Sequence, residues 1–366
     1  MKIKVSQEKL SKALNNVSRI AVGKVTLPIL NNVLIRVDKK KVSLITTNLD
    51  LAIIDYLPVS SSEDGVITVP AKLLAEFINN LPKGESIEFS TKDTKLTISA
   101  GKYSSIINGA LADDFPEIPE INEKNAIIYK ITTDEFKNSL NQVLIASSND
   151  LTRPALTGVF FNTNDNTLAI AATDGYRLAE KKLIDKVESE VKAIVPSSSL
   201  QEVLRSISDD AEEIEIAFND DLVRFRFGEV EIISKLIDAS FPDYQKLIPK
   251  DNNISVKLNR EELTRITKLA ALFSRSVGGS IVCETKSPDK FSVKSIANEF
   301  GENDSELEAN IDKEGKINLN SRFLLDALNA LEEKEIIFSF SDRIAPILLK
   351  NKKDPKYTHI IMPLNS

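Results

Sequence analysis

Apolar residues recur with helical spacing in three well-separated parts of the chain. Segments 5–10, 131–136 and 258–263 align with one another at offsets of 126 and 127 residues. Each begins with the end of an apolar strand, followed by a polar residue suited to a helix N-cap and an acidic residue in the first turn. Apolar residues three and four apart then predict one buried helical face. The three stripes are Leu10, Leu14, Val17; Phe136, Leu140, Val143; and Leu263, Ile266, Ala270, Phe273.

A second helix is predicted deeper in each repeat. Val69-Pro70 and Val195-Pro196 lie 126 residues apart, and Leu319-Asn320 follows 124 residues later. An apolar stripe follows each dipeptide, and alternating segments 86–90, 213–217 and 335–340 come next, which predicts strands. Further alternating runs predict strands at 33–37, 95–99, 158–161, 223–227 and 347–350.

The repeat defines the expected domain organisation. Phe115-Pro116 and Phe241-Pro242 are also 126 residues apart, close to the ends of the first two repeats. A fixed period of this kind indicates duplicated structural units. We therefore expect an α+β chain of three domains, at 1–121, 122–248 and 249–366, each large enough for its own core.

Composition excludes several kinds of chemistry. The chain has one histidine, His359, and one cysteine, Cys283. An intrachain disulfide and any metal site built from several His or Cys residues are therefore excluded, and no cofactor is expected. We interpret Cys283 as a core residue and His359 as a strand residue with a satisfied hydrogen bond. No apolar run approaches the ~20 residues of a membrane span, so we expect an intracellular protein.

Charge is distributed unevenly. The net charge is −7 overall, and it is +1, −8 and 0 in the three expected domains. The predicted helical segments are net positive, whereas the remainder is acidic. One interpretation is that solvated helix faces carry these cations; the other is that the helices meet a polyanion loosely and without reading sequence. The polar helix positions concerned are Lys9, Lys12, Asn16, Arg19, Arg265, Lys268 and Arg275.

Two segments combine residues that are typical of interfaces. Ala172-Thr-Asp-Gly-Tyr-Arg-Leu178 places an aromatic residue and an arginine at a turn beside a strand. The tail Ile360-Ile-Met-Pro-Leu364 is apolar and should fray unless it docks, and methionine suits a groove that accepts several partners.

With these motifs in place, the sequence resembles the bacterial β sliding clamps, the processivity subunits of DNA polymerase III. The resemblance spans the whole chain and has six markers besides the two segments above, among them Ala112-Asp-Asp-Phe-Pro116, Ser234-Lys-Leu-Ile-Asp238 and Asp326-Ala-Leu-Asn-Ala-Leu331. The other three are Thr26-Leu-Pro-Ile-Leu30, Thr152-Arg-Pro-Ala-Leu-Thr-Gly158 and Phe241-Pro-Asp-Tyr244.

The resemblance implies a DNA clamp fold and a role without catalysis. Three copies of a two-helix, two-sheet domain make one chain, and two chains join head to tail into a ring of six domains around duplex DNA. The homodimer would tether the replicative polymerase, the clamp loader, repair polymerases and mismatch-repair proteins, which dock through short peptide motifs. No metal and no membrane partner are implied.

The resemblance also implies site residues. The partner-peptide pocket would comprise Leu156, Thr173, Gly175, Tyr176, Arg177, Leu178, Pro242, Lys246, Leu247, Phe323, Pro346, Ile360, Met362, Pro363 and Leu364. Its apolar members would receive peptide side chains, and Arg177 and Lys246 would meet polar groups at the rim. Positions that approach DNA would be Lys24, Lys72, Asn149, Arg153 and Pro154. The dimer interface would join the edge around Ile107 to Leu272 and Phe273.

Two other functions remain open from the residues themselves. A nucleic-acid enzyme could use a carboxylate metal site formed by Asp174 and Asp243. A repeat-built scaffold could bind proteins and never DNA. The enzyme would differ from the clamp in needing a metal ion for activity. The scaffold would differ in having its helix cations scattered outward instead of sharing one concave face.

Overall fold

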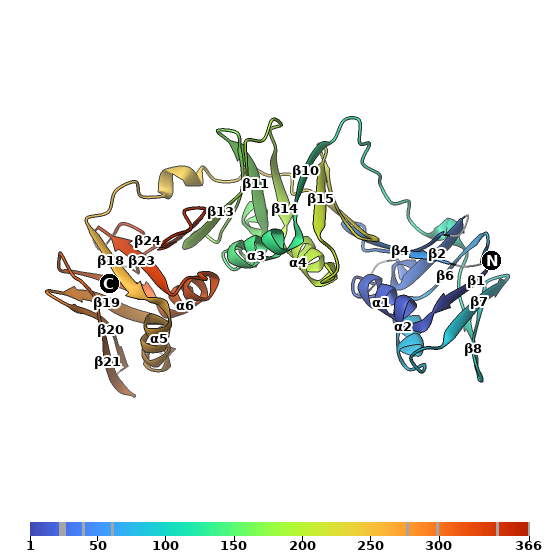
Figure 1. Cartoon of the computed structure of the whole chain (residues 1–366), viewed down its shortest axis with the longest axis horizontal. Coiled ribbons are helices and arrows are strands. Elements are labelled where there is room, and N and C mark those ends of the chain that lie inside the picture. The colour runs from blue at the N-terminus through green and yellow to red at the C-terminus, as the bar shows by residue number, and fades with distance from the viewer. Residues whose placement is uncertain are drawn as a thin grey trace. The chain divides into compact units, whose positions relative to one another are not determined.

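The computed structural model describes residues 1–21, 27–38, 41–59, 62–275, 278–297, 300–341 and 344–364. Within it the chain forms two compact units (Figure 1). Unit 1 contains residues 1–134 and 198–236, and unit 2 contains residues 135–197 and 237–366. The second sequence repeat is therefore divided between the two units.

The described helices follow the predicted repeat. The first helix of each repeat is α1 (Gln7–Val17), α3 (Thr133–Leu144) or α5 (Arg260–Ser274). The second is α2 (Ala71–Asn79), α4 (Ser197–Ser206) or α6 (Ser321–Ala330). Side-chain caps explain several starts: Ser6 accepts from the backbone N–H of Lys9, and Asn259 accepts from those of Glu261 and Glu262.

Unit 1 contains two antiparallel sheets. A five-stranded sheet has the order β5-β1-β7-β8-β9, and an eight-stranded sheet has the order β10-β15-β16-β17-β4-β3-β2-β6. The strands of the first are β1 (Lys2–Ser6), β5 (Ser62–Glu63), β7 (Ser86–Lys92), β8 (Lys95–Ala100) and β9 (Tyr103–Asn108). Those of the second are β2 (Asn32–Asp38), β3 (Lys41–Thr47), β4 (Leu51–Pro58), β6 (Gly65–Pro70), β10 (Ile127–Thr132), β15 (Glu213–Phe218), β16 (Leu222–Phe227) and β17 (Val230–Lys235).

Unit 2 repeats this arrangement. An eight-stranded sheet has the order β14-β11-β12-β13-β25-β24-β23-β18, and a four-stranded sheet has the order β21-β20-β19-β22. The strands of the first are β11 (Gly158–Asn164), β12 (Thr167–Thr173), β13 (Arg177–Asp185), β14 (Lys192–Pro196), β18 (Ile254–Asn259), β23 (Glu335–Phe340), β24 (Ile347–Asn351) and β25 (Tyr357–Ile361). Those of the second are β19 (Ser280–Lys286), β20 (Lys290–Ala297), β21 (Gly301–Glu308) and β22 (Gly315–Asn320).

Each large sheet crosses a sequence repeat boundary. In unit 1, β17 pairs with β4 through the register Val230↔Asp55 to Ser234↔Leu51. In unit 2, β13 pairs with β25 through the register Arg177↔Ile361 to Lys181↔Tyr357. Because main-chain hydrogen bonds join the repeats, strands from two repeats share one surface in each unit.

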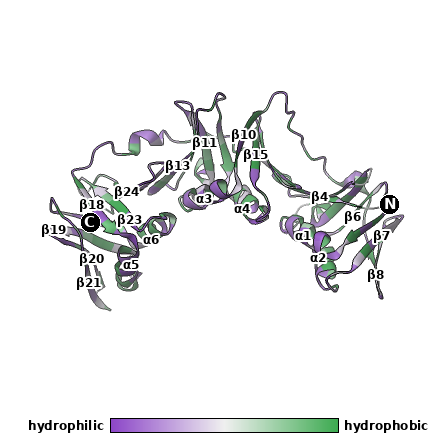
Figure 2. Ribbon diagram, viewed as in Figure 1, coloured by the Kyte–Doolittle hydropathy of each residue, from purple (hydrophilic) through white to green (hydrophobic). Residues whose placement is uncertain are grey.

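Helix packing supplies the core of each unit. In unit 1, α1 packs on α2 and on β3 and β4; in unit 2, α5 packs on α6 and on β19, β20 and β21. Hydrophobic positions on these helices alternate with polar ones along each ribbon (Figure 2). Leu10, Leu140 and Leu263 from the predicted stripes are fully buried, whereas Phe273 is half-buried. The amphipathic prediction therefore holds except at the last residue of the α5 stripe.

Candidate functional site

The turn between β12 and β13 is fixed by its own side chains. Thr173 Oγ1 donates to the carbonyl of Arg177 at 2.7 Å and accepts from Gly175 N–H at 3.1 Å. Asp174 Oδ1 accepts from the N–H groups of Tyr176 and Arg177 at 2.9 and 3.0 Å. Gly175 has φ of +91°, a conformation that favours glycine. This turn leaves the Tyr176 side chain 63% exposed.

Arg177, the next residue, is buried. Its side chain is 7% exposed, its Nε donates to Asp174 Oδ2 at 3.0 Å, and one terminal nitrogen donates to Asp326 Oδ2 at 2.6 Å. The guanidinium carbon is 4.5 Å from the centroid of the Phe323 ring, which also stacks on Tyr176 at 6.5 Å. Two carboxylates and an aromatic face therefore hold its guanidinium, and the expectation that Arg177 meets a peptide at the rim stays a prediction.

The apolar tail docks beside this aromatic pair. Met362 N–H donates to the carbonyl of Tyr176 at 2.8 Å, and Leu364 N–H donates to the carbonyl of Asn318 at 2.9 Å. Met362, Pro363 and Leu364 are half-buried. The β24–β25 ladder ends at Ile347↔Ile361, so Pro346 and Met362 are the next residues on the two strands.

A small apolar cluster supports the same surface from below. Leu178 and Ile360 are buried with Tyr244, and half-buried Phe241 packs against them. The rings of Phe160 and Phe241 stack at 4.8 Å. Segment 241–248, including η4 (Tyr244–Leu247), therefore covers the sheet face where β13 meets β25.

The predicted pocket residues divide into a buried floor and an accessible surface. Leu156, Thr173, Arg177, Leu178 and Ile360 are buried. Phe323, Pro346, Met362, Pro363 and Leu364 are half-buried, and Gly175, Tyr176, Pro242, Lys246 and Leu247 are exposed. Contacts in unit 2 bring together Tyr176, Phe323 and Met362, which we call the aromatic patch. Lys246 stays at the surface and pairs with Asp243 at 2.7 Å, a hydrogen bond that raises the pKa of Lys246.

Asp326 was missed as a site residue. It follows Phe323 by three residues on α6, so the two side chains lie on one helix face. That spacing, together with a buried arginine in need of a partner, is the signal that could have identified it.

The predicted DNA-facing residues are partly outside the described chain. Lys24 lies outside the described residues. Lys72 is exposed in the first turn of α2, and Asn149, Arg153 and Pro154 are exposed before or at the start of η3 (Pro154–Thr157). A Cβ built at Gly175 would lie 3.7 Å from one terminal nitrogen of Arg153, so Arg153 borders the aromatic patch.

Two of the polar helix residues have structural partners instead of an open face. Asn16 is buried and donates to Asp55 Oδ2 at 2.9 Å. Arg19 donates to Glu202 at 2.9 Å and to Ser206 Oγ at 2.5 Å. The expectation of a polyanion surface at these two positions is therefore wrong. Lys9, Lys12, Arg265, Lys268 and Arg275 are exposed, and Lys12 pairs with Asp210 at 3.3 Å.

Burial distinguishes the accessible from the inaccessible side chains at the predicted dimer interface. Ile107 is 5% exposed on edge strand β9, whereas its neighbour Ile106 is 63% exposed. Leu272 is 56% exposed and Phe273 is half-buried on α5. The side chain available for a contact at the β9 edge is therefore that of Ile106.

The lone Cys and His are both buried. Burial raises the pKa of the Cys283 thiol to about 12 and, together with the charge of Arg177, lowers the pKa of His359 to about 3. His359 Nδ1 lies 2.9 Å from the Tyr357 hydroxyl, whereas its Nε2 has no partner in the described part of the chain. The interpretation of Cys283 as a core residue is confirmed, and the histidine is satisfied at one nitrogen.

The carboxylates of the alternative metal site have other partners. Both oxygens of Asp174 accept hydrogen bonds within the turn or from Arg177, and Asp243 pairs with Lys246. No group of three or more His, Cys, Asp or Glu residues in the described ranges could hold a metal ion. No helix within those ranges is long and apolar enough to cross a membrane.

Comparison with known proteins agrees with this architecture over the whole length. Family models of the DNA polymerase III beta subunit match residues 1–119 as its N-terminal domain, 130–243 as its central domain and 245–365 as its C-terminal domain. The beta sliding clamp of Staphylococcus epidermidis is 30% identical, with all of both chains covered.

Solved structures give the same result. The DNA polymerase sliding clamp from Bacillus subtilis is 28% identical with a TM-score of 0.94, covering 100% of this chain and 99% of that one. The C. crescentus beta sliding clamp, with polyethylene glycol bound to its putative beta-motif tethering region, is 29% identical with a TM-score of 0.93 and full coverage of both chains. The chain therefore belongs to the β sliding clamp family, the non-catalytic processivity subunits of DNA polymerase III, and has three clamp domains.

Proposed function

We propose that two copies of this chain join head to tail into a ring of six domains that encircles duplex DNA. Because the chain belongs to the β sliding clamp family, its role is that of a processivity clamp. The ring itself is supported by one sheet edge in each unit, β9 in unit 1 and β21 in unit 2, where no further strand of the described residues pairs. Exposed edges are templates for pairing with another chain, and a contact between different ends, used twice, closes a dimer.

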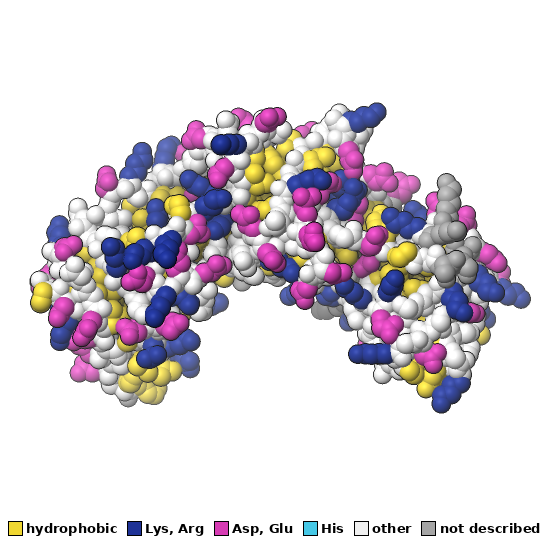
Figure 3. Space-filling view, viewed as in Figure 1, with side chains coloured by type: hydrophobic (Ala, Val, Ile, Leu, Met, Phe, Trp, Pro, Cys, Tyr) yellow, Lys and Arg dark blue, Asp and Glu magenta, His cyan; other side chains and the backbone are white. Residues whose placement is uncertain are grey.

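Side chains at the two edges are complementary. Near β9 the exposed residues include Ile106, Lys95 and Lys102. The β21 edge carries Glu302, Asp304, Glu306 and Glu308, and hydrophobic side chains gather near the ends of α5 and β21 (Figure 3). An apolar centre between basic and acidic rims favours a contact between β9 of one protomer and β21 of its partner.

DNA would be retained by topology. We propose that the helices face the hole, with Lys24, Lys72, Asn149, Arg153 and Pro154 approaching the duplex. The chain has a net charge of −7, which opposes tight binding by counterion release. A closed ring needs no tight contact, so weak phosphate contacts allow it to slide.

The aromatic patch is proposed as the docking site for partners. Exposed Tyr176, stacked Phe323 and half-buried Met362 form an apolar surface over a floor held by Arg177 and Asp326. Pre-organised aromatic and methionine surfaces suit short peptides with apolar side chains. The partners would be the replicative polymerase catalytic subunit, the clamp loader, repair polymerases and mismatch-repair proteins. In the C. crescentus clamp, polyethylene glycol occupies a putative beta-motif tethering region, which supports a pocket of this kind.

A fluorescence polarisation titration tests the docking site. The probe is a labelled peptide from the C-terminus of the same organism's polymerase III catalytic subunit. The double variant Met362→Ala, Leu364→Ala should bind the peptide at least about tenfold more weakly. This corresponds to a loss of ~1.4 kcal/mol in binding free energy, as expected when a patch loses two apolar side chains. Ile296→Ala is the control, because Ile296 is 67% exposed on β20, outside the patch. Equal affinities for all three proteins would refute the assignment.

The clamp role is tested by primer extension with polymerase and loader. Addition of the protein should lengthen the products of single binding events, with no nuclease activity of its own. We place this activity in the cytoplasm, on the nucleoid during replication. A scaffold that never meets DNA would leave product length unchanged.

A further inference from the structure

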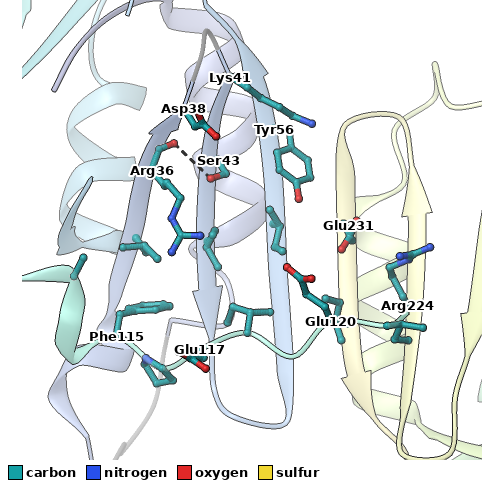
Figure 4. A pocket seen from close by; sticks show the side chains of 18 of the residues that line it. Arg36, Asp38, Lys41, Ser43, Tyr56, Phe115, Glu117, Glu120, Arg224 and Glu231 are labelled. Atoms are coloured by element: carbon teal, nitrogen blue, oxygen red, sulfur yellow. Dashed lines mark hydrogen bonds between the residues drawn. The ribbon is translucent and has the colours of Figure 1, made fainter. Parts of the chain in front are cut away.

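A groove with a volume of about 1020 Å³ lies in unit 1, and none of the residues that line it belongs to the aromatic patch. One wall is the segment that carries Phe115, Glu117 and Glu120, and the floor is the sheet formed by β2, β3, β4, β17 and β16 (Figure 4). Strands β4 and β17 come from different sequence repeats, so the groove spans a repeat boundary within one unit.

The centre of the groove floor is apolar. Buried Leu34, Ile45, Ile54 and Ile233 form one cluster with Phe115, and half-buried Ile118 and Tyr56 pack against it. An apolar floor of this length offers sites for alternate side chains of an extended segment.

The wall segment is acidic and has unpaired carboxylates. Asp113, Glu117 and Glu120 are exposed and make no ion pair with other residues that the structure describes. The arginines on the opposite side are already neutralised: Arg224 pairs with Glu123 at 3.0 Å, and Arg226 pairs with Glu231 at 3.2 Å. Arg36 and Lys41 also line the groove, so its lining has six carboxylates against four cations, and this excess favours a cationic occupant.

The internal repeat explains why the groove is open. Phe160, Phe241 and Tyr244 fill the equivalent face of unit 2, where the first two rings stack at 4.8 Å. At the offset of 126 residues, Leu34 replaces Phe160 and Ile118 replaces Tyr244, whereas Phe115 retains the ring of Phe241. Because Leu34 and Ile118 are smaller than the aromatic side chains they replace, the volume that the rings occupy in unit 2 is unfilled in unit 1.

We propose that this groove is a second docking site, and that its occupant is an extended segment of a partner protein with alternating apolar and Lys or Arg side chains. The apolar side chains lie over Ile118 and Ile233, and the cations meet Glu117 and Glu120. The site does not depend on the aromatic patch and stands whether or not that patch binds peptides.

The test is a titration of the full-length protein, labelled at isoleucine methyl groups, followed by NMR. The probes are a short synthetic peptide that alternates Leu and Arg and a matched peptide that alternates Leu and Glu. The Arg peptide should shift the Ile118 and Ile233 methyl signals saturably, with at least about tenfold higher affinity than the Glu peptide. Signals of Ile360 and Ile361, which precede Met362 on β25, should not move.

Charge reversal supplies the matched controls. Glu117→Lys with Glu120→Lys should lower the affinity for the Arg peptide about tenfold or more. Glu188→Lys with Glu190→Lys changes the net charge equally on exposed residues of unit 2 and should leave the affinity unchanged. The proposal is overturned if the shifts centre on Ile360 and Ile361, if both peptides bind equally, if both double variants lose affinity alike, or if no saturable shift occurs at about 1 mM peptide.

Discussion

Replacing Arg177 by Met should loosen the aromatic patch without removing a peptide contact. The change keeps a long side chain but leaves Asp174 and Asp326 without their cation. It also removes the guanidinium from the Phe323 ring, 4.5 Å away. Arg177 is thus a positioning residue, whose effect reaches a peptide only through Tyr176 and Phe323.

The size of the effect follows from burial. Breaking a buried ion pair by removing one partner costs about 3–5 kcal/mol when the remaining charge stays dry. The Asp174 and Asp326 side chains are 15% and 31% exposed, so water restores part of their solvation. We expect a loss of about 2–3 kcal/mol in local stability, which corresponds to a roughly 30- to 150-fold increase in the opening equilibrium.

Amide hydrogen exchange measures that local opening directly. Amides of β13 and β25 should exchange roughly 30- to 150-fold faster in Arg177→Met, whereas those of α1 in unit 1 should not change. Lys246→Met is the control, since Lys246 is exposed and should leave both sets unchanged. Unchanged exchange in Arg177→Met combined with a large loss of peptide affinity would refute the reasoning and make Arg177 a direct contact.

Three further predictions concern burial and the proposed interface. Burial raises the pKa of Asp55 to about 6 from an ordinary 3.8, because it disfavours the charged carboxylate. The folded state is therefore stabilised by protonation of Asp55; this stabilisation is complete below pH ~4 and is lost as the pH rises through 6. Asp55→Asn, which can still accept from Asn16, should stabilise unit 1 by up to about 3 kcal/mol at neutral pH, with no gain at pH ~4, as urea unfolding at the two pH values would reveal. Leu272→Asp should convert a dimer to monomers in sedimentation velocity, with Ile106→Asp having the same effect, and an unchanged sedimentation coefficient would contradict the interface. Buried Cys283 should react with an aromatic disulfide reagent only as fast as its sheet opens, so stoichiometric labelling within seconds in native buffer would contradict its burial.

Local sequence signals predicted helix starts better than helix ends. The predicted segment 131–136 contains the start of α3, but the apolar stripe that follows it to Val143 carried no signal for the helix end at Leu144. The chain leaves the helix where polar residues offer other hydrogen bonds: Ser147 Oγ donates to the carbonyl of Leu144, and Asp150 accepts from Thr152. Capping needs only neighbouring residues, whereas the end depends on competing turn chemistry.

Long-range contacts account for what the sequence left undetermined at the site. The turn around Gly175 could be predicted from its residues, but the ion pair between Arg177 and Asp326 joins positions 149 residues apart. The pairing of β4 with β17, which shapes the unit 1 groove, likewise joins separate repeats. Repeat periodicity indicated equivalent elements, but it carried no information on which sheet edges meet.

Topological retention on DNA tests the central claim most directly. The protein is loaded on nicked circular DNA by a clamp loader that recognises it, washed in high salt, and followed before and after the DNA is linearised. We predict that the protein stays bound through the salt wash and leaves when the circle is cut, because a ring slides off an open end. Release by salt from circular and linear DNA alike would mean ordinary electrostatic binding and would contradict a closed clamp.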